Sequence, residues 1–181
     1  MKIGVIGGGR VGSGLAAFWE KARHDVRVST RDTVADTAAF ADVVVLAVPA
    51  SVVPEVLSTA GAALEGKVVI DATNNLRGGP GAEEIATLVP GARVVKAFNT
   101  VFAALYDQIA AAAERPDLVY CGDDESGKET VAALIRDAGF EPVDAGPLAS
   151  AGDVEAFARL VIGIAYEQGR GPFVYRFASQ P

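Results

Sequence analysis

The sequence has 181 residues, 50% of them apolar, and carries a net charge of −7 at pH 7. This length allows one domain with a substantial core, and the acidic balance argues against a nucleic-acid scaffold while permitting a small anionic ligand in one cationic pocket. No apolar run is long enough to span a bilayer, no signal-peptide core follows the N-terminus, and the single cysteine, Cys121, cannot form an internal disulfide. We therefore expect a cytoplasmic protein that binds neither nucleic acid nor membrane.

Short β-rich runs alternate with segments of helical periodicity along the chain. Strands are expected at 2–7, 24–30, 41–49, 67–74, 92–100, 117–124 and 140–147, and helices at 12–22, 32–40, 54–65, 81–91, 101–114, 126–139 and 153–168. The strands are continuous Val and Ile runs, as expected when helices cover both faces of a sheet. This alternation predicts an α/β fold with a doubly wound, mostly parallel sheet of the Rossmann type.

Residues that commonly begin or end helices support some of these boundaries. Asp32 is expected to be the N-cap of the helix at 32–40, and Gly139 to end the helix at 126–139. The tail, 169–181, is expected to pack on the domain as a loop or short extension. The last helix and the tail carry more apolar surface than one small domain needs to cover. This excess predicts a homodimer that uses Val154, Phe157, Leu160, Val161 and Ile164 of the helix and Phe173, Tyr175 and Phe177 of the tail.

A glycine turn joins the first strand to the first helix. Residues 7–12 match the pattern G-x-G-x-x-G. In this pattern Gly7 permits the tight turn, Gly9 lets a pyrophosphate approach the backbone, and Gly12 lets the helix pack on the strand. The pyrophosphate would lie at the helix N-terminus, where free N–H groups favour an anion. We therefore expect a dinucleotide at Gly7, Gly8, Gly9, Arg10, Val11 and Gly12; the alternative is a glycine-rich turn that binds nothing.

The end of the second strand selects between dinucleotides. It reads Ser29, Thr30 and Arg31, where an NAD site would place an acid that binds the ribose 2′-hydroxyl. A guanidinium can bind a 2′-phosphate bidentately, and two hydroxyls can donate to it. The segment therefore predicts NADP(H). In the alternative, Asp32 is the ribose acid, shifted by a residue or more.

Other reactive residues have structural interpretations. The segment 122–130 nearly matches the phosphate-loop pattern, but a Glu replaces the Ser or Thr whose hydroxyl would bind the metal. His24 lies in a turn and Cys121 ends a buried strand. Neither has the neighbours in the sequence for a metal site or a nucleophile–base pair, so we expect no metal. Lys96 is the only buried-strand candidate for moving a proton, and we interpret it as a structural or anion-contacting lysine.

The chain resembles the coenzyme F420-dependent NADP oxidoreductases, also described as NADPH-dependent deazaflavin reductases. The resemblance is carried, in the same order and over nearly the whole chain, by IGVIGGGRVGSGLA, VSTR, VVLAVP, VVIDATN, VVKAFNT, CGDDESGK, FEPVDAGPL and GRGPF. It implies a single NADP-binding Rossmann domain over 1–181 with a small C-terminal helical cap, in which 148–181 form the last helix and the tail. It also implies that the NADP phosphates contact the glycine turn and the pair Thr30 and Arg31.

The resemblance also implies where the reacting rings lie. The nicotinamide would lie past the third strand, by Ala47, Val48 and Pro49. The second cofactor would lie beyond the fourth and fifth strands, near Thr73, Asn74, Asn99 and Thr100, with Gly146 and Pro147 closing the pocket. The family often has Pro in an Asp-Pro-Thr-Asn turn, whereas this chain reads Asp-Ala-Thr-Asn at 71–74. That departure leaves the identity of the acceptor open.

The activity implied is hydride transfer between NADPH and a deazaflavin or flavin-like acceptor, such as coenzyme F420, FMN or FAD. Transfer between stacked rings requires no protein acid at the reacting carbon, so no catalytic side chain is expected. The same architecture occurs in the cytosolic domains of metalloreductases that pass hydride to a flavin. The alternative function is a non-catalytic NADPH-binding sensor or regulatory module.

Overall fold

The computed structural model describes residues 1–75 and 81–178. Within them, seven strands form a sheet of order β2-β1-β3-β4-β5-β6-β7. The strands are β1 Lys2–Ile6, β2 Asp25–Ser29, β3 Val43–Leu46, β4 Val68–Asp71, β5 Arg93–Lys96, β6 Asp117–Gly122 and β7 Glu141–Asp144. The helices are α1 Arg10–Lys21, α2 Val34–Phe40, α3 Val53–Ala60, α4 Ala82–Leu88, α5 Tyr106–Ala110, α6 Glu125–Asp137 and α7 Ala151–Ile162. This arrangement confirms the predicted α/β, mostly parallel sheet.

The strand directions define one functional edge of the sheet. Strands β1 to β5 are parallel, so their last residues meet at one edge, which we call the carboxyl edge. Strand β6 is antiparallel to β5, with Lys96 opposite Cys121, and β7 is parallel to β6. The carboxyl ends of β6 and β7 are therefore directed away from the carboxyl edge. In open α/β sheets, ligands bind outside the carboxyl ends of the parallel strands.

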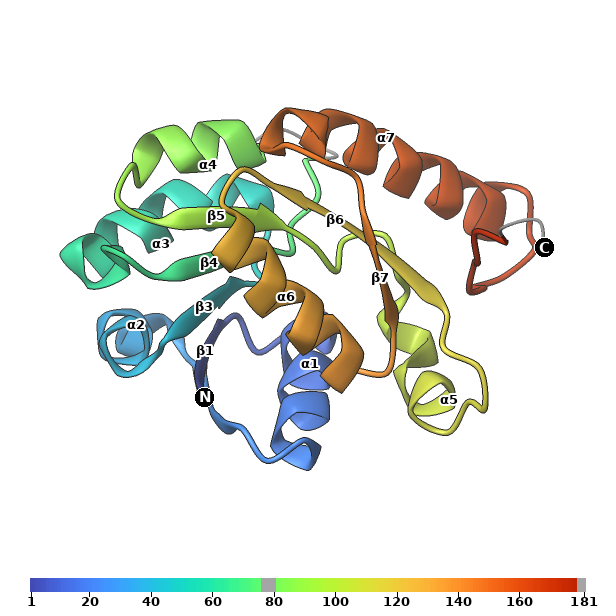
Figure 1. Ribbon diagram of the computed structural model, residues 1–181, viewed down its shortest axis with the longest axis horizontal. Helices are drawn as coiled ribbons and strands as arrows, with labels where there is room; N and C mark the ends of the chain where they lie inside the picture. Colours follow the sequence, from blue (N-terminus) through green and yellow to red (C-terminus); the bar gives the residue numbers. More distant parts are fainter. Residues whose placement is uncertain (76–80, 179–181) are drawn as a thin grey trace.

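Helices cover both faces of the sheet, which explains the continuous apolar strands. Every residue of β3 and β4 is buried. One face packs on α1, α5 and α6, where Trp19 and Phe140 are fully buried, and the other packs on α2, α3, α4 and α7 (Figure 1). The two apolar layers fix the sheet as a rigid support for the loops at its edge. Within the described ranges, no helix combines the length and apolar character needed to cross a membrane.

The start of α2 differs from the prediction. Asp32 does not cap this helix; it lies inside a 3₁₀ turn, Arg31–Thr33, that precedes it. The Thr30 backbone N–H donates to Thr33 Oγ1 at 3.0 Å, and the two threonine hydroxyls lie 3.2 Å apart. This pair of hydroxyls holds the turn and leaves the Asp32 side chain exposed.

Two helices end differently from their predictions. Instead of a helix at 101–114, a 3₁₀ turn leads into α5, which stops at Ala110. Residues 111–114 are all exposed and Pro116 follows, so neither packing nor the backbone favours further turns. On α7, Val154 and Val161 are buried within the domain, so they are not available to the predicted dimer surface, whereas Leu160 is 59% exposed. A π-helical turn, Gly163–Glu167, extends α7 toward the tail.

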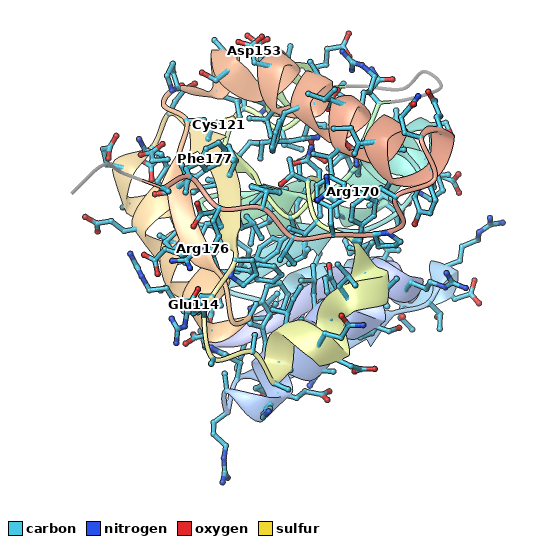
Figure 2. The ribbon with its side chains drawn as sticks, turned by 90° about the vertical axis from the view of Figure 1, so that its right-hand side faces the viewer. Glu114, Cys121, Asp153, Arg170, Arg176 and Phe177 are labelled. Carbon is cyan, nitrogen blue, oxygen red and sulfur yellow. The ribbon has the colours of Figure 1, made fainter. Side chains whose placement is uncertain are left out.

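The tail packs on the domain as an irregular extension, as predicted. Figure 2 shows it crossing the molecule below α7, from Arg170 to Phe177. The Asp117 backbone N–H donates to the Tyr175 carbonyl at 3.1 Å. The ring of Tyr175 stands at 4.9 Å from Phe157 of α7, centroid to centroid. The tail therefore joins α7 to the beginning of β6.

Candidate functional site

The glycine turn at the end of β1 has no room for side chains at two of its three pattern positions. Gly7 has a φ of +117°, and a Cβ there would lie 2.4 Å from the Ala47 carbonyl oxygen. A Cβ on Gly12 would lie 1.8 Å from the Gly7 carbonyl oxygen. Gly9 differs, because a Cβ there would meet nothing within 4 Å. It precedes the first turn of α1, so open space adjoins the free N–H groups of a 12-residue helix.

A cavity of about 410 Å³ opens beside this turn. Its lining brings together three segments that the sequence had singled out: Gly7 and Gly8 of the turn, Ser29, Thr30 and Arg31 after β2, and Val48 and Pro49 after β3. None of the ion pairs among the described residues involves Arg31, so its guanidinium is available to an anion. Asp32 is not among the lining residues. The geometry therefore favours Arg31 over Asp32 as the group next to the ribose.

Sequence reasoning missed the far wall of this cavity. It is formed by Val34 of α2 and by Val52, Glu55, Val56 and Thr59 on and before α3. These residues follow β2 and β3 directly, and the β-strand order places α2 and α3 side by side on one face. The pattern of apolar residues at one face of α3 was visible, but nothing local indicated that part of that face would line a cavity instead of the core.

A smaller cleft of about 180 Å³ lies farther along the carboxyl edge. One wall consists of loop residues after β4 and β5, namely Asn74, Asn99, Thr100, Val101 and Phe102. The other wall is α7 and its extension, through Ala158, Val161, Ile162 and Tyr166. Tyr166 is the only titratable side chain in this lining. We call this the ring cleft.

The two asparagines of the ring cleft hold each other. Asn74 Nδ2 donates to the Asn99 carbonyl at 2.9 Å, and Asn99 Nδ2 donates to Asn74 Oδ1 at 3.1 Å. Asn99 Oδ1 is buried and accepts no hydrogen bond from the residues that the structure describes. A buried acceptor left unpaired is unfavourable, so this oxygen is a candidate partner for an N–H group of a ligand.

Lys96, the last residue of β5, is fully buried. Its ammonium donates to Asp71 Oδ2 at 2.8 Å, to the Thr73 carbonyl at 2.7 Å and to Glu155 Oε1 at 2.8 Å. An ammonium group has three N–H donors, and all three are used. This geometry supports the structural interpretation of Lys96, because no free donor faces a substrate. Asp71 and Glu155 as its partners were not found from the sequence.

Gly146 and Pro147, which the resemblance implied would close the acceptor pocket, are not among the residues that line the ring cleft. The Gly146 carbonyl accepts from the Gly122 N–H, and Gly122 pairs with Val95 inside the sheet. Leu148 N then donates to Asp123 Oδ1. Because β6 and β7 run against β5, the chain leaves β7 away from the carboxyl edge. The α7 helix, which follows, lines the cleft in their place.

The remaining candidates have structural roles. Asp124 caps α6 by accepting from the Gly127 N–H at 2.7 Å. The segment 122–130, which resembles a phosphate loop, is therefore a strand end followed by a capped helix. His24 Nε2 lies 2.9 Å from Asp137 Oδ2. His24 follows the C-terminal end of α1, whereas the glycine turn precedes the N-terminal end of that helix. Burial raises the pKa of the Cys121 thiol to about 11, so it is not a thiolate at neutral pH. No cluster of metal-binding side chains occurs among residues 1–75 and 81–178.

A cavity of about 400 Å³ at the opposite edge of the sheet does not belong to this site. It lies between α3 and α4, with Leu57, Leu88 and Glu65 in its lining. That lining contains no cation, and it adjoins the segments that enter β4 and β5 instead of those that leave them. The cavity beside the glycine turn is therefore the better candidate for an anionic dinucleotide.

Comparison with known proteins agrees with this geometry. Residues 29–75 match the family profile described as NADP oxidoreductase, coenzyme F420-dependent. A solved structure from an Arthrobacter species, provisionally described as an F420-dependent NADP reductase, has a TM-score of 0.87 and 27% identity, covering 99% of this chain and 100% of that one. The chain therefore resembles this family in sequence over residues 29–75 and in fold over nearly its whole length. These similarities support an NADP-dependent oxidoreductase with NADP(H) as its cofactor.

Two further comparisons show how much of other proteins this chain matches. Metalloreductase STEAP3 of Rattus norvegicus is 38% identical over 99 residues, which are 51% of this chain and 20% of that protein. The chain therefore spans only about one fifth of the length of this metalloreductase. The structure of a hypothetical protein from Sinorhizobium meliloti is 30% identical with a TM-score of 0.64, over 83% of this chain and 87% of that one.

Proposed function

We propose that the protein transfers hydride between NADPH and a flavin-like or deazaflavin ring that enters the ring cleft. The observation that carries this proposal is the alignment of two hollows along one sheet edge. The cavity beside the glycine turn presents Arg31 for a 2′-phosphate, and the ring cleft lies past the ends of β4 and β5. A dinucleotide that begins in the first hollow would bring its nicotinamide past Ala47, Val48 and Pro49 toward the second.

The residues of the ring cleft suit a reaction that moves no proton through the protein. Its walls are amide, hydroxyl and apolar groups, and the buried Lys96 has no free N–H. Hydride transfer between two rings needs close stacking and exclusion of water, and the cofactors supply the chemistry. Asn99 Oδ1 would accept from the N–H edge of such a ring or from the nicotinamide carboxamide. Coenzyme F420, FMN and FAD all fit this description.

One observation favours a second function. The ring cleft measures about 180 Å³, whereas small-molecule sites usually measure about 300–1,000 Å³. A tricyclic ring would be only partly enclosed by the described residues. This favours the alternative of a non-catalytic NADPH-binding sensor or regulatory module, in which the cleft holds only the nicotinamide.

The two functions are separated by a turnover screen. The absorbance of reduced nicotinamide would be followed with NADPH against FMN, FAD, riboflavin and coenzyme F420, with NADH as the comparison donor. Enzymatic oxidation of NADPH by at least one ring acceptor supports the oxidoreductase. Tight NADPH binding without acceleration of any acceptor supports the sensor.

A homodimer is part of the same proposal. Four large apolar side chains on α7, its extension and the tail are exposed: Leu160, Tyr166, Val174 and Phe177. Leu160 and Tyr166 lie on α7 and its extension, which line the ring cleft, so a second copy there would shelter the cleft from water. Light scattering at micromolar concentration would show twice the monomer mass if this surface is the interface.

A further inference from the structure

A buried ionic network ties α7 to the carboxyl edge. The side chains of Lys96 and Asp71 are 0% exposed, and that of Glu155 is 9% exposed. Glu155 comes from α7, 59 residues along the chain from Lys96. Buried apolar side chains of α7, among them Val154 and Val161, also pack on the domain. Apolar contacts are not directional, so the ion pair is the directed contact that fixes where α7 lies.

The network reaches both walls of the ring cleft. On the loop side, Asp71 Oδ1 accepts from the Thr73 N–H at 3.0 Å and from Thr73 Oγ1 at 2.7 Å, and Thr73 leads into the Asn74–Asn99 pair. On the helix side, Glu155 is one turn before Ala158, which lines the opposite wall. Lys96 binds Asp71 and the Thr73 carbonyl on one side and Glu155 on the other. Lys96 therefore connects the two walls through its hydrogen bonds.

We infer that Glu155 and Lys96 are positioning residues that set the width of the ring cleft and so determine how the acceptor ring stacks. This inference rests on the proposed function. Buried ion pairs often contribute little net stability compared with apolar packing, so a fixed geometry is the better explanation for keeping one here. Ring spacing controls transfer, because a displacement of about 1 Å can lower the rate by about 10²-fold.

The charges of the network make Glu155 the residue to change. One cation faces two carboxylates, so removing Glu155 leaves Lys96 and Asp71 as a balanced pair. Removing Lys96 would instead leave two buried carboxylates without a counter-ion. Glu155→Gln keeps the shape and a hydrogen-bond acceptor, whereas Glu155→Ala removes the tie. Asp153→Asn is the matched control, because Asp153 is an exposed acid on the same helix (Figure 2).

The test compares acceptor kinetics, NADPH affinity and amide hydrogen exchange in the 181-residue chain. We expect Glu155→Ala to lower kcat/KM for the ring acceptor by about tenfold or more, since misplacement acts on the stacked geometry. We expect Glu155→Gln to show a smaller loss, and Asp153→Asn to match the parent. The NADPH Kd should stay within about twofold in all three, because the glycine turn does not contact the network. Amide exchange should become faster at both walls, at 73–75 and 158–162, in Glu155→Ala alone.

Each outcome decides between the inference and its alternatives. Folded Glu155 variants with parental acceptor kinetics overturn it, and so does an equal loss of NADPH affinity, which would indicate a general role in the fold. If Glu155→Ala does not fold, Glu155→Gln carries the same comparison. If none of the tested ring acceptors allows the parent protein to oxidise NADPH, the proposed function fails. The hydrogen-exchange measurement then still tests whether Glu155 connects the two walls. Unchanged exchange at 73–75 in Glu155→Ala would overturn that inference.

Discussion

The two hollows of the carboxyl edge are built in different ways. The cavity beside the glycine turn uses short, contiguous segments, with Gly7 and Gly12 five residues apart and Arg31 directly after β2. The ring cleft uses partners that are distant in sequence: Asn74 and Asn99 are 25 residues apart, and Lys96 and Glu155 are 59 apart. The proposed cofactor site therefore depends on local backbone shape, and the proposed acceptor site depends on how separate elements are held together.

The largest expected effect is on stability and concerns Lys96, which connects the two walls of the ring cleft. Lys96→Ala should lower the free energy of unfolding by about 3–5 kcal/mol, because it leaves Asp71 and Glu155 buried without their counter-ion. Urea unfolding followed by the fluorescence of Trp19 would measure it. Lys21→Ala, at an exposed lysine of α1, should change stability by less than about 0.5 kcal/mol. Equal stability of the two variants would mean that the network contributes no more than a surface charge.

The next effect is confined to the cofactor cavity. Arg31→Ala should weaken NADPH binding by about 1.5–3 kcal/mol and leave NADH binding almost unchanged, because a charged hydrogen bond to the 2′-phosphate is lost. Arg31→Lys should retain part of the preference, since it keeps the charge without the bidentate geometry. Titration of each variant with both cofactors would measure this. If Asp32→Ala changed the preference and Arg31→Ala did not, the alternative with Asp32 as the ribose acid would hold.

Two alanine substitutions separate the roles of the glycines. Gly12→Ala should destabilise the protein by about 1–3 kcal/mol, because its Cβ would overlap the Gly7 carbonyl. Gly9→Ala should leave stability near that of the parent but reduce the rise in Tm that NADPH produces, because the methyl group would occupy the space proposed for the pyrophosphate. Thermal melts with and without NADPH measure both. A parental NADPH response in Gly9→Ala would place the pyrophosphate elsewhere.

The smallest expected effect is at Tyr166 of the ring cleft. Tyr166→Phe should lower the chemical step by less than about tenfold, whereas loss of a general acid usually costs about 10²–10⁴ in rate. Single-turnover mixing of the NADPH complex with the acceptor would measure the step. A loss of a hundredfold or more would indicate proton transfer by the phenol, and a carbonyl or imine would then be a better substrate than a flavin-like ring.

The sequence was sufficient for the features that depend on contiguous residues. The parallel sheet, the glycine turn and the grouping of Ser29, Thr30 and Arg31 follow from local patterns. The fold is confirmed, and the family resemblance is supported by the match over residues 29–75. Local reasoning failed where two local interpretations competed. Asp32 looked like a helix cap, but the hydroxyls of Thr30 and Thr33 hold the turn instead.

The features that sequence could not supply depend on strand direction and long-range pairing. Nothing in residues 117–122 indicates that β6 runs against β5, and this reversal moves Gly146 and Pro147 away from the ring cleft. Similarly, Lys96 was recognised as a buried lysine, but its partner Glu155 lies on a helix read only for its apolar face. Strand order and direction must be known before such pairs can be assigned.

The measurement that tests the central claim most directly follows the hydride itself. NADPH deuterated at the reactive C4 position would be mixed with the protein and 5-deazariboflavin, whose reduced ring carries the transferred atom on carbon. We predict that deuterium appears at C5 of the reduced deazaflavin in proportion to the NADPH oxidised. Arg31→Ala should slow this transfer when NADPH is limiting. Deuterium released to water, or NADPH left unoxidised with the deazaflavin and with each of the natural ring cofactors, would contradict it.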